Sequence, residues 1–172
     1  DWGEQALDIV EQLIQANSSP LICTFHSFSA RLLRRHADLV GYGRDFTICD
    51  TDDQKRVFKT IYDELHLTNS DISMNGARRS VSHAKSRNWS SEDLAEHFRG
   101  QGDEIVRIYE AYQRFLKRSN AVDFDDLLLL PIELFNSNKS ILQYYQNRFQ
   151  YVLVDEYQDT NKPQFEFIFN VS

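Results

Sequence analysis

The segment that most limits how this chain can fold is residues 151–164, YVLVDEYQDTNKPQ. It opens with a largely apolar run that leads directly into Asp155 and Glu156. Apolar residues without alternation are typical of a strand covered on both faces, as in a parallel α/β sheet. Ligands of open α/β sheets bind at the carboxyl ends of the strands, where Asp155 stands. The segment therefore predicts an α/β fold with acidic residues at a ligand site.

The chemistry of these carboxylates fits a nucleotide site. Mg²⁺ binds a small number of carboxylates together with phosphate oxygens and water, a role that suits Asp155. Glu156 would orient or deprotonate the water that attacks a terminal phosphate. Gln158 and Asp159 follow in the next turn, where they would sense the phosphate. The alternative is a polar strand end, in which residues 159–161 only cap the helix that follows.

The remaining sequence predicts a second strand-then-helix unit and a helical block between the two units. Residues 21–25 form a short apolar strand, and a helix starts at His26. Apolar residues at helical spacing predict further helices at residues 4–16, 51–65, 103–118, 127–135, 141–149 and 163–169. Thr51 is the expected cap of its helix, and Pro131 is expected to kink or restart the helix that contains it. Residues 68–91 are expected to form short helices and loops, and the rest of the sheet is expected outside this chain.

Composition narrows the class of protein. The chain has 172 residues and a net charge of −7, which argues against a surface covered with nucleic-acid contacts but allows a local basic face. No apolar run approaches the roughly 18 residues that a membrane span requires, and no signal-peptide pattern is visible. Cys23 and Cys49 give neither a disulfide framework nor metal spacing, and they are expected to be reduced core thiols of a cytoplasmic protein.

Residues 24–35, TFHSFSARLLRR, combine aromatic rings, a histidine, hydroxyl groups and arginines. Single-stranded nucleic acid is bound by base stacking together with basic side chains along its backbone. Hydroxyls and helix N-terminal amides suit phosphate groups, which position the strand without reading its sequence. The alternative is that Phe25 and Phe28 belong to the core and the arginines are solvated; Phe28 is expected in the core.

A second basic segment is residues 77–89, ARRSVSHAKSRNW. No acid occurs between Asp71 and Glu92, and the segment contains His83 together with the cations Arg78, Arg79, Lys85 and Arg87. These cations are candidates for contact with duplex DNA, which would make binding depend on salt. The alternative is a solvated basic face without a ligand.

The string VLVDEYQDTN closely resembles motif II, the Walker B-type element, of superfamily 1 DNA helicases of the UvrD/Rep/PcrA type. TFHSFSARLLRR is similar to the DNA-contacting strand-to-helix segment of that family. VDFDDLLLL, residues 122–130, is similar to the segment that re-enters the motor core after an inserted helical subdomain. FTICDTDDQ and QYYQNRFQYVLVDE also resemble their counterparts, so the resemblance covers nearly the whole chain, from after motif Ia to just past motif II.

The resemblance implies a role for each matching residue. Asp155 would hold Mg²⁺ and Glu156 would be the catalytic base. Gln158 and Asp159 would couple the nucleotide state to movement on DNA. The single-stranded DNA track would be lined by Thr24, Phe25, His26, Ser27 and Arg31. In the family the inserted subdomain can lie against duplex DNA ahead of the motor, which would involve the basic segment at residues 77–89.

The resemblance also implies an architecture and an activity. It implies part of a RecA-like parallel sheet core of the P-loop NTPase type with a helical insertion, and a chain mostly α by content. Residues 1–47 and 121–172 would belong to domain 1A, and residues 48–120 to subdomain 1B. The intact protein would be a cytoplasmic, ATP-dependent 3′-to-5′ helicase and translocase that acts on single-stranded DNA and at its junctions with duplex, in DNA repair or replication.

The chain departs from the family in lacking the phosphate-binding loop, because GxxxxGK[ST] does not occur in it. In the family that loop would lie upstream of residue 1 and the later motifs beyond Ser172. We therefore expect Mg²⁺ and ATP to bind the intact protein, and neither a bound cofactor nor appreciable ATPase activity in this piece. Two alternatives remain: the helicase subunit of a helicase–nuclease recombination complex, and a non-catalytic DNA-binding module that kept the same fold.

Overall fold

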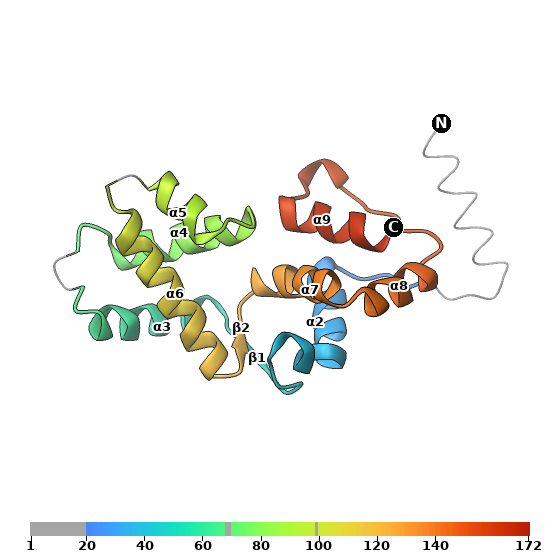
Figure 1. Ribbon diagram of the computed structural model, residues 1–172, viewed down its shortest axis with the longest axis horizontal. Coiled ribbons are helices and arrows are strands. Elements are labelled where there is room, and N and C mark those ends of the chain that lie inside the picture. The colour runs from blue at the N-terminus through green and yellow to red at the C-terminus, as the bar shows by residue number, and fades with distance from the viewer. Residues whose placement is uncertain (1–19, 68–69, 99) are drawn as a thin grey trace.

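The computed structural model describes residues 20–67, 70–98 and 100–172. These residues form two helical lobes that lie side by side and are joined by two short strands (Figure 1). We call residues 49–121 the helical lobe, and residues 20–48 with 122–172 the motif lobe. The helix expected at residues 4–16 lies outside the described residues.

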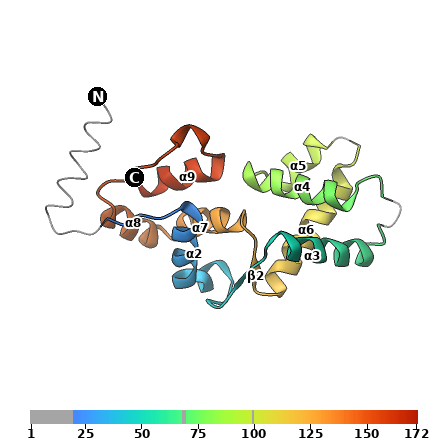
Figure 2. The same ribbon diagram turned by 180° about the vertical axis from the view of Figure 1, so that it is seen from behind.

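The motif lobe is built on α7, which contacts both α2 and α9. The two opposite views of the molecule agree that α9 lies over α7 (Figures 1 and 2). Its elements are α2 (Phe25–His36), η1 (Ala37–Val40), α7 (Asp126–Ser137), α8 (Lys139–Arg148), η2 (Tyr157–Asp159) and α9 (Lys162–Val171). Their shared core includes Leu33, Phe46, Leu127, Phe135 and Phe167.

The helical lobe has a separate core between four helices of the described chain. They are α3 (Thr51–Glu64), α4 (Met74–Ser86), α5 (Ser91–His97) and α6 (Gly102–Arg118). The predicted helix at residues 103–118 is confirmed as α6, which buries Ile105, Ile108, Tyr112 and Leu116 along one face. Each of these positions is three or four residues from the next, which is the spacing that keeps side chains on one side of a helix.

Two strands form the connection between the lobes. β1 (Thr47–Ile48) pairs in parallel with β2 (Ala121–Val122), so that the chain leaves the motif lobe and returns to it at one place. Additional contacts fix this junction. The Lys117 ammonium donates to the Val40 carbonyl at 2.7 Å, and the Asn120 side-chain oxygen accepts from the Gly43 amide at 2.7 Å.

The strands expected at residues 21–25 and 151–154 are wrong. Neither segment pairs as a strand with any described residue, and Phe25 already begins α2. Tyr151 and Leu153 are 55% and 54% exposed, whereas Val152 packs against the core. A strand needs a hydrogen-bonding neighbour in addition to a suitable sequence. The parallel sheet in the described chain is therefore the β1–β2 pair alone, and the described residues are mostly helical.

Several smaller expectations also need correction. Cys49 is buried, but Cys23 is exposed and is not a core thiol. Asp50 caps α3, because its carboxylate accepts from the Asp52 and Asp53 amides at 2.8 and 2.9 Å, and Thr51 is the first helical residue. Pro131 lies buried inside α7, and the helix does not restart there, because it continues through Pro131 as one element. Within residues 68–91, α4 forms a single helix of 13 residues rather than only short pieces.

None of the helices in the described part of the chain has both the length and the apolar character needed to cross a lipid bilayer.

Candidate functional site

The predicted acidic site is an exposed turn just before α9. Glu156 has φ 50° and ψ 41°, a left-handed conformation uncommon outside glycine. Its amide donates to Asp155 Oδ1 at 3.0 Å, and its carbonyl accepts from the Asp159 amide at 2.9 Å. The Gln158 side-chain amide donates to the Glu156 carboxylate. One turn therefore brings together Asp155, Glu156, Gln158 and Asp159.

The acidic turn is followed by a well-defined helix start. Asn161 and Gln164 form a capping box at the N-terminus of α9, with reciprocal hydrogen bonds of 3.0 and 2.9 Å. The caps that the alternative interpretation assigned to residues 159–161 are thus supplied by Asn161. Asp155 and Glu156 have no part in this cap.

The carboxylates at Asp155 and Glu156 fit a hard cation that takes only a few of its ligands from the protein. The described residues contain no group of three or more His, Cys, Asp or Glu side chains placed to hold a metal ion. Mg²⁺ commonly takes few protein carboxylates and completes its shell with phosphate oxygens and water. The exposed carboxylate of Asp155 fits as one such ligand, with Glu156 beside it.

The N-terminus of α2 presents hydroxyl and amide groups to solvent. Thr24 caps the helix: its Oγ1 accepts from the Ser27 amide at 3.2 Å and donates to Ser27 Oγ at 3.0 Å. Both residues are exposed, and the first turn contains no acid. A helix N-terminus of this kind attracts anions through its amides and dipole. Arg31, one to two turns later, is also exposed.

The aromatic residues at this helix start are partly used within the protein. Phe25 meets Phe167 of α9 edge-on, with 6.4 Å between ring centroids. His26 meets Phe124, which lies just before α7, with 5.7 Å between centroids. Phe28 packs against the motif-lobe core, which confirms the expectation for it. Phe124 is 51% exposed and extends the aromatic surface beside His26. Sequence reasoning missed it, although a phenylalanine between aspartates at a helix start was a usable signal.

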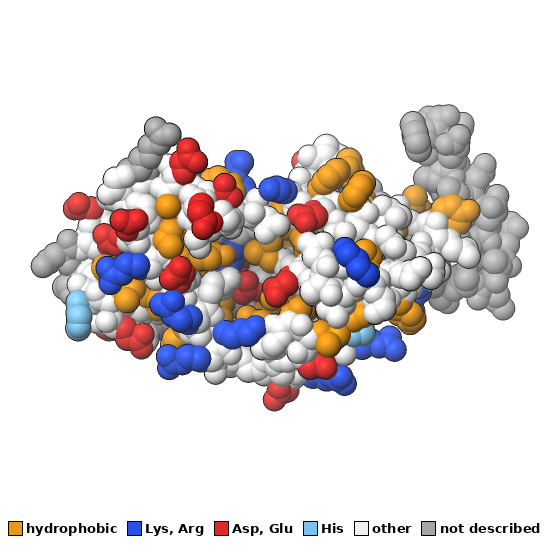
Figure 3. Space-filling view, in the orientation of Figure 1, with side chains coloured by type: hydrophobic (Ala, Val, Ile, Leu, Met, Phe, Trp, Pro, Cys, Tyr) orange, Lys and Arg blue, Asp and Glu red, His pale blue; other side chains and the backbone are white. Residues whose placement is uncertain are grey.

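The second basic segment forms α4 and the turn after it. Arg79 and Arg87 are exposed, and the Arg87 guanidinium carbon lies 5.9 Å from the Trp89 ring centroid. His83 is exposed and its ring lies 5.1 Å from that of Trp89. Arg78 is half-buried, and its Nε has no hydrogen-bond partner among the described residues. Figure 3 shows acidic and basic side chains interspersed over one face of the helical lobe.

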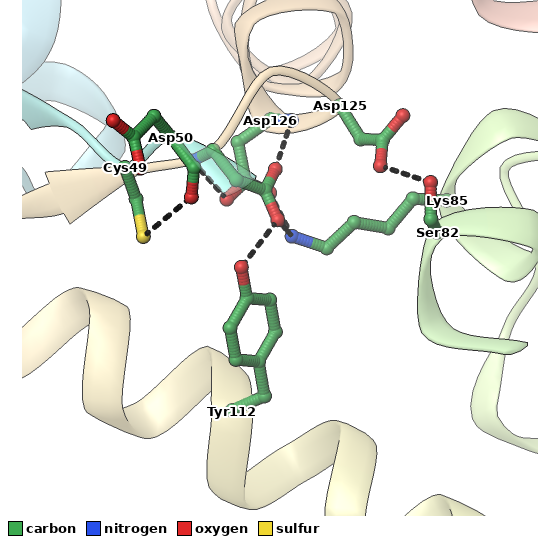
Figure 4. A network of polar contacts seen from close by, with 8 residues as sticks. Cys49, Asp50, Ser82, Lys85, Tyr112, Asp125 and Asp126 are labelled. Atoms are coloured by element: carbon green, nitrogen blue, oxygen red, sulfur yellow. Dashed lines mark hydrogen bonds and ion pairs between the residues drawn. The ribbon is translucent and has the colours of Figure 1, made fainter. Parts of the chain in front are cut away.

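Lys85 is not on this surface, so the prediction of a DNA-contacting cation there is wrong. It is 1% exposed, and its ammonium lies 2.7 Å from Asp123 Oδ2 and 2.8 Å from Asp126 Oδ1 (Figure 4). It shares the inner face of α4 with Val81, one turn earlier, which is also buried. A buried ammonium of this kind cannot reach a phosphate group.

Lys85 belongs to a polar network between the lobes that the sequence did not reveal. The Tyr112 hydroxyl donates to Asp123 Oδ2 at 2.9 Å. The Asp126 amide donates to Asp123 Oδ1 at 2.8 Å, and the Asp123 amide to Asp126 Oδ2 at 3.2 Å. Next to this cluster the Ser82 hydroxyl donates to Asp125 Oδ2 at 2.8 Å. The network joins α4 and α6 of the helical lobe to residues 123–126, which lead into α7.

Burial and pairing set the protonation states of this network. Burial alone would lower the pKa of Lys85, but Asp126 and Asp123 together raise it above its usual value. Burial acts to raise the pKa of Asp123, but Lys85 lowers it overall. Burial raises the pKa of Asp126 to about 6, against the opposing effect of Lys85. Lys85 and Asp123 are therefore charged at neutral pH.

Comparison with known proteins places these features in a family. The sequence profile of the UvrD/REP helicase N-terminal domain matches residues 5–172. An ATP-dependent DNA helicase PcrA of Staphylococcus epidermidis is 39% identical over 163 residues, which cover 92% of this chain and 22% of the relative. The protein of the same name from Staphylococcus aureus is 40% identical over 146 residues, covering 84% of this chain and 20% of the relative. The chain thus spans about a fifth of the length of these relatives.

Proposed function

The chain belongs to the UvrD/REP helicase N-terminal domain family, and on that premise we propose that it is part of a DNA helicase that hydrolyses ATP to move along single-stranded DNA. Within such a motor it would supply the acidic part of the nucleotide site and one contact surface for DNA. The observation that carries this proposal is the exposed turn in which Asp155, Glu156, Gln158 and Asp159 lie together.

Each residue of the turn has a distinct role in this proposal. Asp155 would bind Mg²⁺, which neutralises charge on the transferred phosphate when it is bound. The Glu156 carboxylate accepts a hydrogen bond from Gln158, which holds it in place. Glu156 would accept the proton of the attacking water. Gln158 and Asp159 would then report the nucleotide state to neighbouring parts of the motor.

The N-terminus of α2 is the proposed contact for single-stranded DNA. The hydroxyls of Thr24 and Ser27 and the amides of the first turn suit phosphate oxygens. His26 and the exposed ring of Phe124 offer a surface on which a base would stack. Phe25 links this helix to α9, so both proposed sites share one lobe.

The two lobes have proposed counterparts in the motor. The helical lobe would be the inserted subdomain 1B, placed at residues 48–120, with Arg78, Arg79 and Arg87 toward duplex DNA. The motif lobe would be part of a RecA-like domain 1A. Tyr151 and Leu153 would then be covered by further strands of that domain, since extended apolar segments are stable when paired.

The finer activity is proposed on family membership alone. Movement would run 3′ to 5′, at junctions of single-stranded and duplex DNA, in repair or replication in the cytoplasm. ATP and Mg²⁺ would be required, and the chain would need the phosphate-binding lysine of the whole protein, because its own sequence contains no GxxxxGK[ST].

The test is unwinding by the full-length protein of duplexes that carry a 3′ or a 5′ single-stranded tail. The proposal expects ATP-dependent unwinding of the 3′-tailed duplex only. Unwinding from the 5′ tail would overturn the direction. Tail-dependent DNA binding without ATP hydrolysis would indicate a non-catalytic DNA-binding module, and nuclease products would indicate a helicase–nuclease subunit.

A further inference from the structure

Residues 123–126, which lead into the start of α7, face both candidate DNA-binding surfaces. On one side its carboxylates meet α4, through Lys85 at 2.7 and 2.8 Å and Ser82 at 2.8 Å (Figure 4). On the other side Phe124 meets His26 of α2, with 5.7 Å between ring centroids. A short run of residues, 123–126, therefore connects the helix with the exposed arginines to the helix with the exposed hydroxyls.

We infer that Lys85 is a positioning residue: held between Asp123 and Asp126, it fixes the orientation of α4, and with it the helical lobe, relative to the α2 N-terminus. The part of this inference that concerns DNA rests on the proposed function. Lys85 itself contacts no DNA. It sets the distance between the surface around Arg79 and Arg87 and the surface around Thr24 and Ser27.

The chemistry of the contact favours orientation over stability. A buried ion pair commonly contributes no more stability than apolar side chains of the same volume, because both ions lose their hydration. It does specify geometry, since an ammonium between two carboxylates is satisfied in one arrangement. Here the Tyr112 hydroxyl and the paired amides of Asp123 and Asp126 occupy further acceptor positions. Any rotation of the helical lobe would leave buried charges unpaired.

A second contact supports the same orientation from α9. The Asn88 side-chain amide, just beyond α4, donates to Glu166 Oε2 at 3.3 Å. This contact is exposed and long, so it is weaker than the buried one. Together they place the end of α4 against both α7 and α9. Lys85 remains the only buried ammonium group among the described residues.

The orientation is measured by the distance between nitroxide labels in the full-length protein. Lys59 on α3 and Gln143 on α8 are exposed and lie in different lobes. The parent protein should give one narrow distance distribution. Lys85→Met keeps most of the length of the side chain but removes its charge, and should give a broader or shifted distribution. Arg79→Gln, an exposed cation on the same helix, should leave the distribution unchanged.

Measurements of DNA affinity distinguish a residue that positions the helical lobe from one that contacts DNA directly. If only about a tenth of Lys85→Met molecules hold the competent orientation, the apparent Kd for a single-strand/duplex junction rises about tenfold. The slope of log K against log salt should stay at the parent value, because no phosphate contact is lost. Arg79→Gln should instead lower the magnitude of that slope by about 0.7 to 0.9. An unchanged slope for Arg79→Gln would count against the proposed DNA surface and leave the orientation result intact.

If Lys85→Met does not fold, a variant in which all three buried charges are removed still tests the inference. The triple variant Lys85→Met, Asp123→Asn, Asp126→Asn leaves no unpaired buried charge. It should fold, shown by a cooperative unfolding transition, and still give a broadened distance distribution. A folded Lys85→Met or triple variant with the narrow parent distribution would overturn the inference. A reduced salt slope in Lys85→Met, with the parent distribution, would show that Lys85 reaches phosphate directly.

Discussion

The two lobes differ in how completely they bury their own apolar side chains. Among the described residues, the large apolar side chains that remain exposed all lie outside residues 49–121; they include Ile22, Tyr151, Leu153, Tyr157, Phe165 and Phe169. In the helical lobe the rings of Phe58 and Tyr112 are 1% exposed and stack at 4.7 Å. The helical lobe therefore buries its large apolar side chains within its own core. The motif lobe carries apolar surface of the kind that marks contact with other protein.

This difference separates the parts of the chain that local pattern explains from those that it does not explain. Where a helix has one apolar face and a core to bury it in, sequence and structure agree, as at α6. At residues 151–154, where an apolar run predicted a strand, the described structure shows none. The acidic turn lies immediately after that segment, so its proposed chemistry and its exposed surroundings belong to the same lobe.

The largest expected effect is on the free energy of unfolding, when a phenylalanine is replaced in each of the two lobes. Phe58→Ala should lower the free energy of unfolding by about 3–5 kcal/mol, because it leaves a cavity in the helical-lobe core. Phe169, which is 73% exposed, is the matched control, and Phe169→Ala should change stability by no more than about 0.5 kcal/mol. Urea unfolding of the chain measures both. Equal losses at the two sites would contradict the contrast between the lobes.

The next effect concerns the charge between the lobes. Lys85→Met should cost about 3–5 kcal/mol of unfolding free energy, because Asp123 and Asp126 lose their buried counter-ion. The triple variant with Asn at both aspartates should recover most of that loss. Denaturant unfolding monitored by circular dichroism gives both values. If Lys85→Met is as stable as the parent, the ammonium does not hold the carboxylates together in solution.

Stability should also depend on pH through Asp126. Its pKa is about 6 in the folded protein, against an ordinary value of 3.8, so the native state binds more protons between these values. The stabilisation from protonated Asp126 is fully present below pH 3.8 and is lost as pH rises through about 6. Asp123, whose pKa is lowered, acts in the opposite sense and loses its contribution as pH falls.

Asp126→Asn isolates this contribution. The groups that face the Asp126 carboxyl are Lys85 from α4 and Asp123 from its own turn, and Tyr112 of α6 bonds Asp123. The variant should lose the decline in stability between pH 4 and 6 that Asp126 gives the parent. Urea midpoints measured across that range test it. A parent and variant with parallel pH profiles would show that Asp126 does not titrate there.

The smallest effects are expected at two matched helix caps. Ser90 caps α5 in the helical lobe, and Asn161 caps α9 in the motif lobe, each within a capping box. Replacing either by Ala should cost about 0.5–2 kcal/mol. Hydrogen exchange of the amides in the first turn of each helix shows whether the loss stays local. Exchange that spreads through the whole motif lobe in Asn161→Ala would mark that lobe as the less cooperative of the two.

Much of the fold could be predicted from the sequence, because the buried residues of a helix recur every three or four positions. The helices expected at residues 103–118 and 163–169 were found as α6 and α9. α4 was missed because its buried positions are mostly small or charged, among them Ala77, Ala84 and Lys85. Those residues give no apolar stripe, so only the packing against other helices reveals which face is inside.

The candidate sites also differ in whether their contacts join residues that are close in sequence or far apart in sequence. Asp155 and Glu156 were placed from a local string, and the hydrogen bonds of their turn run between residues close in sequence. Lys85 was assigned to a basic surface because its neighbours in sequence are basic. Its actual partners, Asp123 and Asp126, are 38 and 41 residues away. No local pattern carries that pairing, and only the approach of α4 to α7 creates it.

The most direct test of the proposed motor is ATP hydrolysis by the full-length protein with Glu156→Gln. This change keeps the size of the side chain and its contact with Gln158 but removes the proton acceptor. DNA-stimulated kcat should fall by about 10²–10⁴-fold, with ATP still bound, because a positioned general base contributes about that much. A variant that hydrolyses ATP at the parent rate would contradict the account.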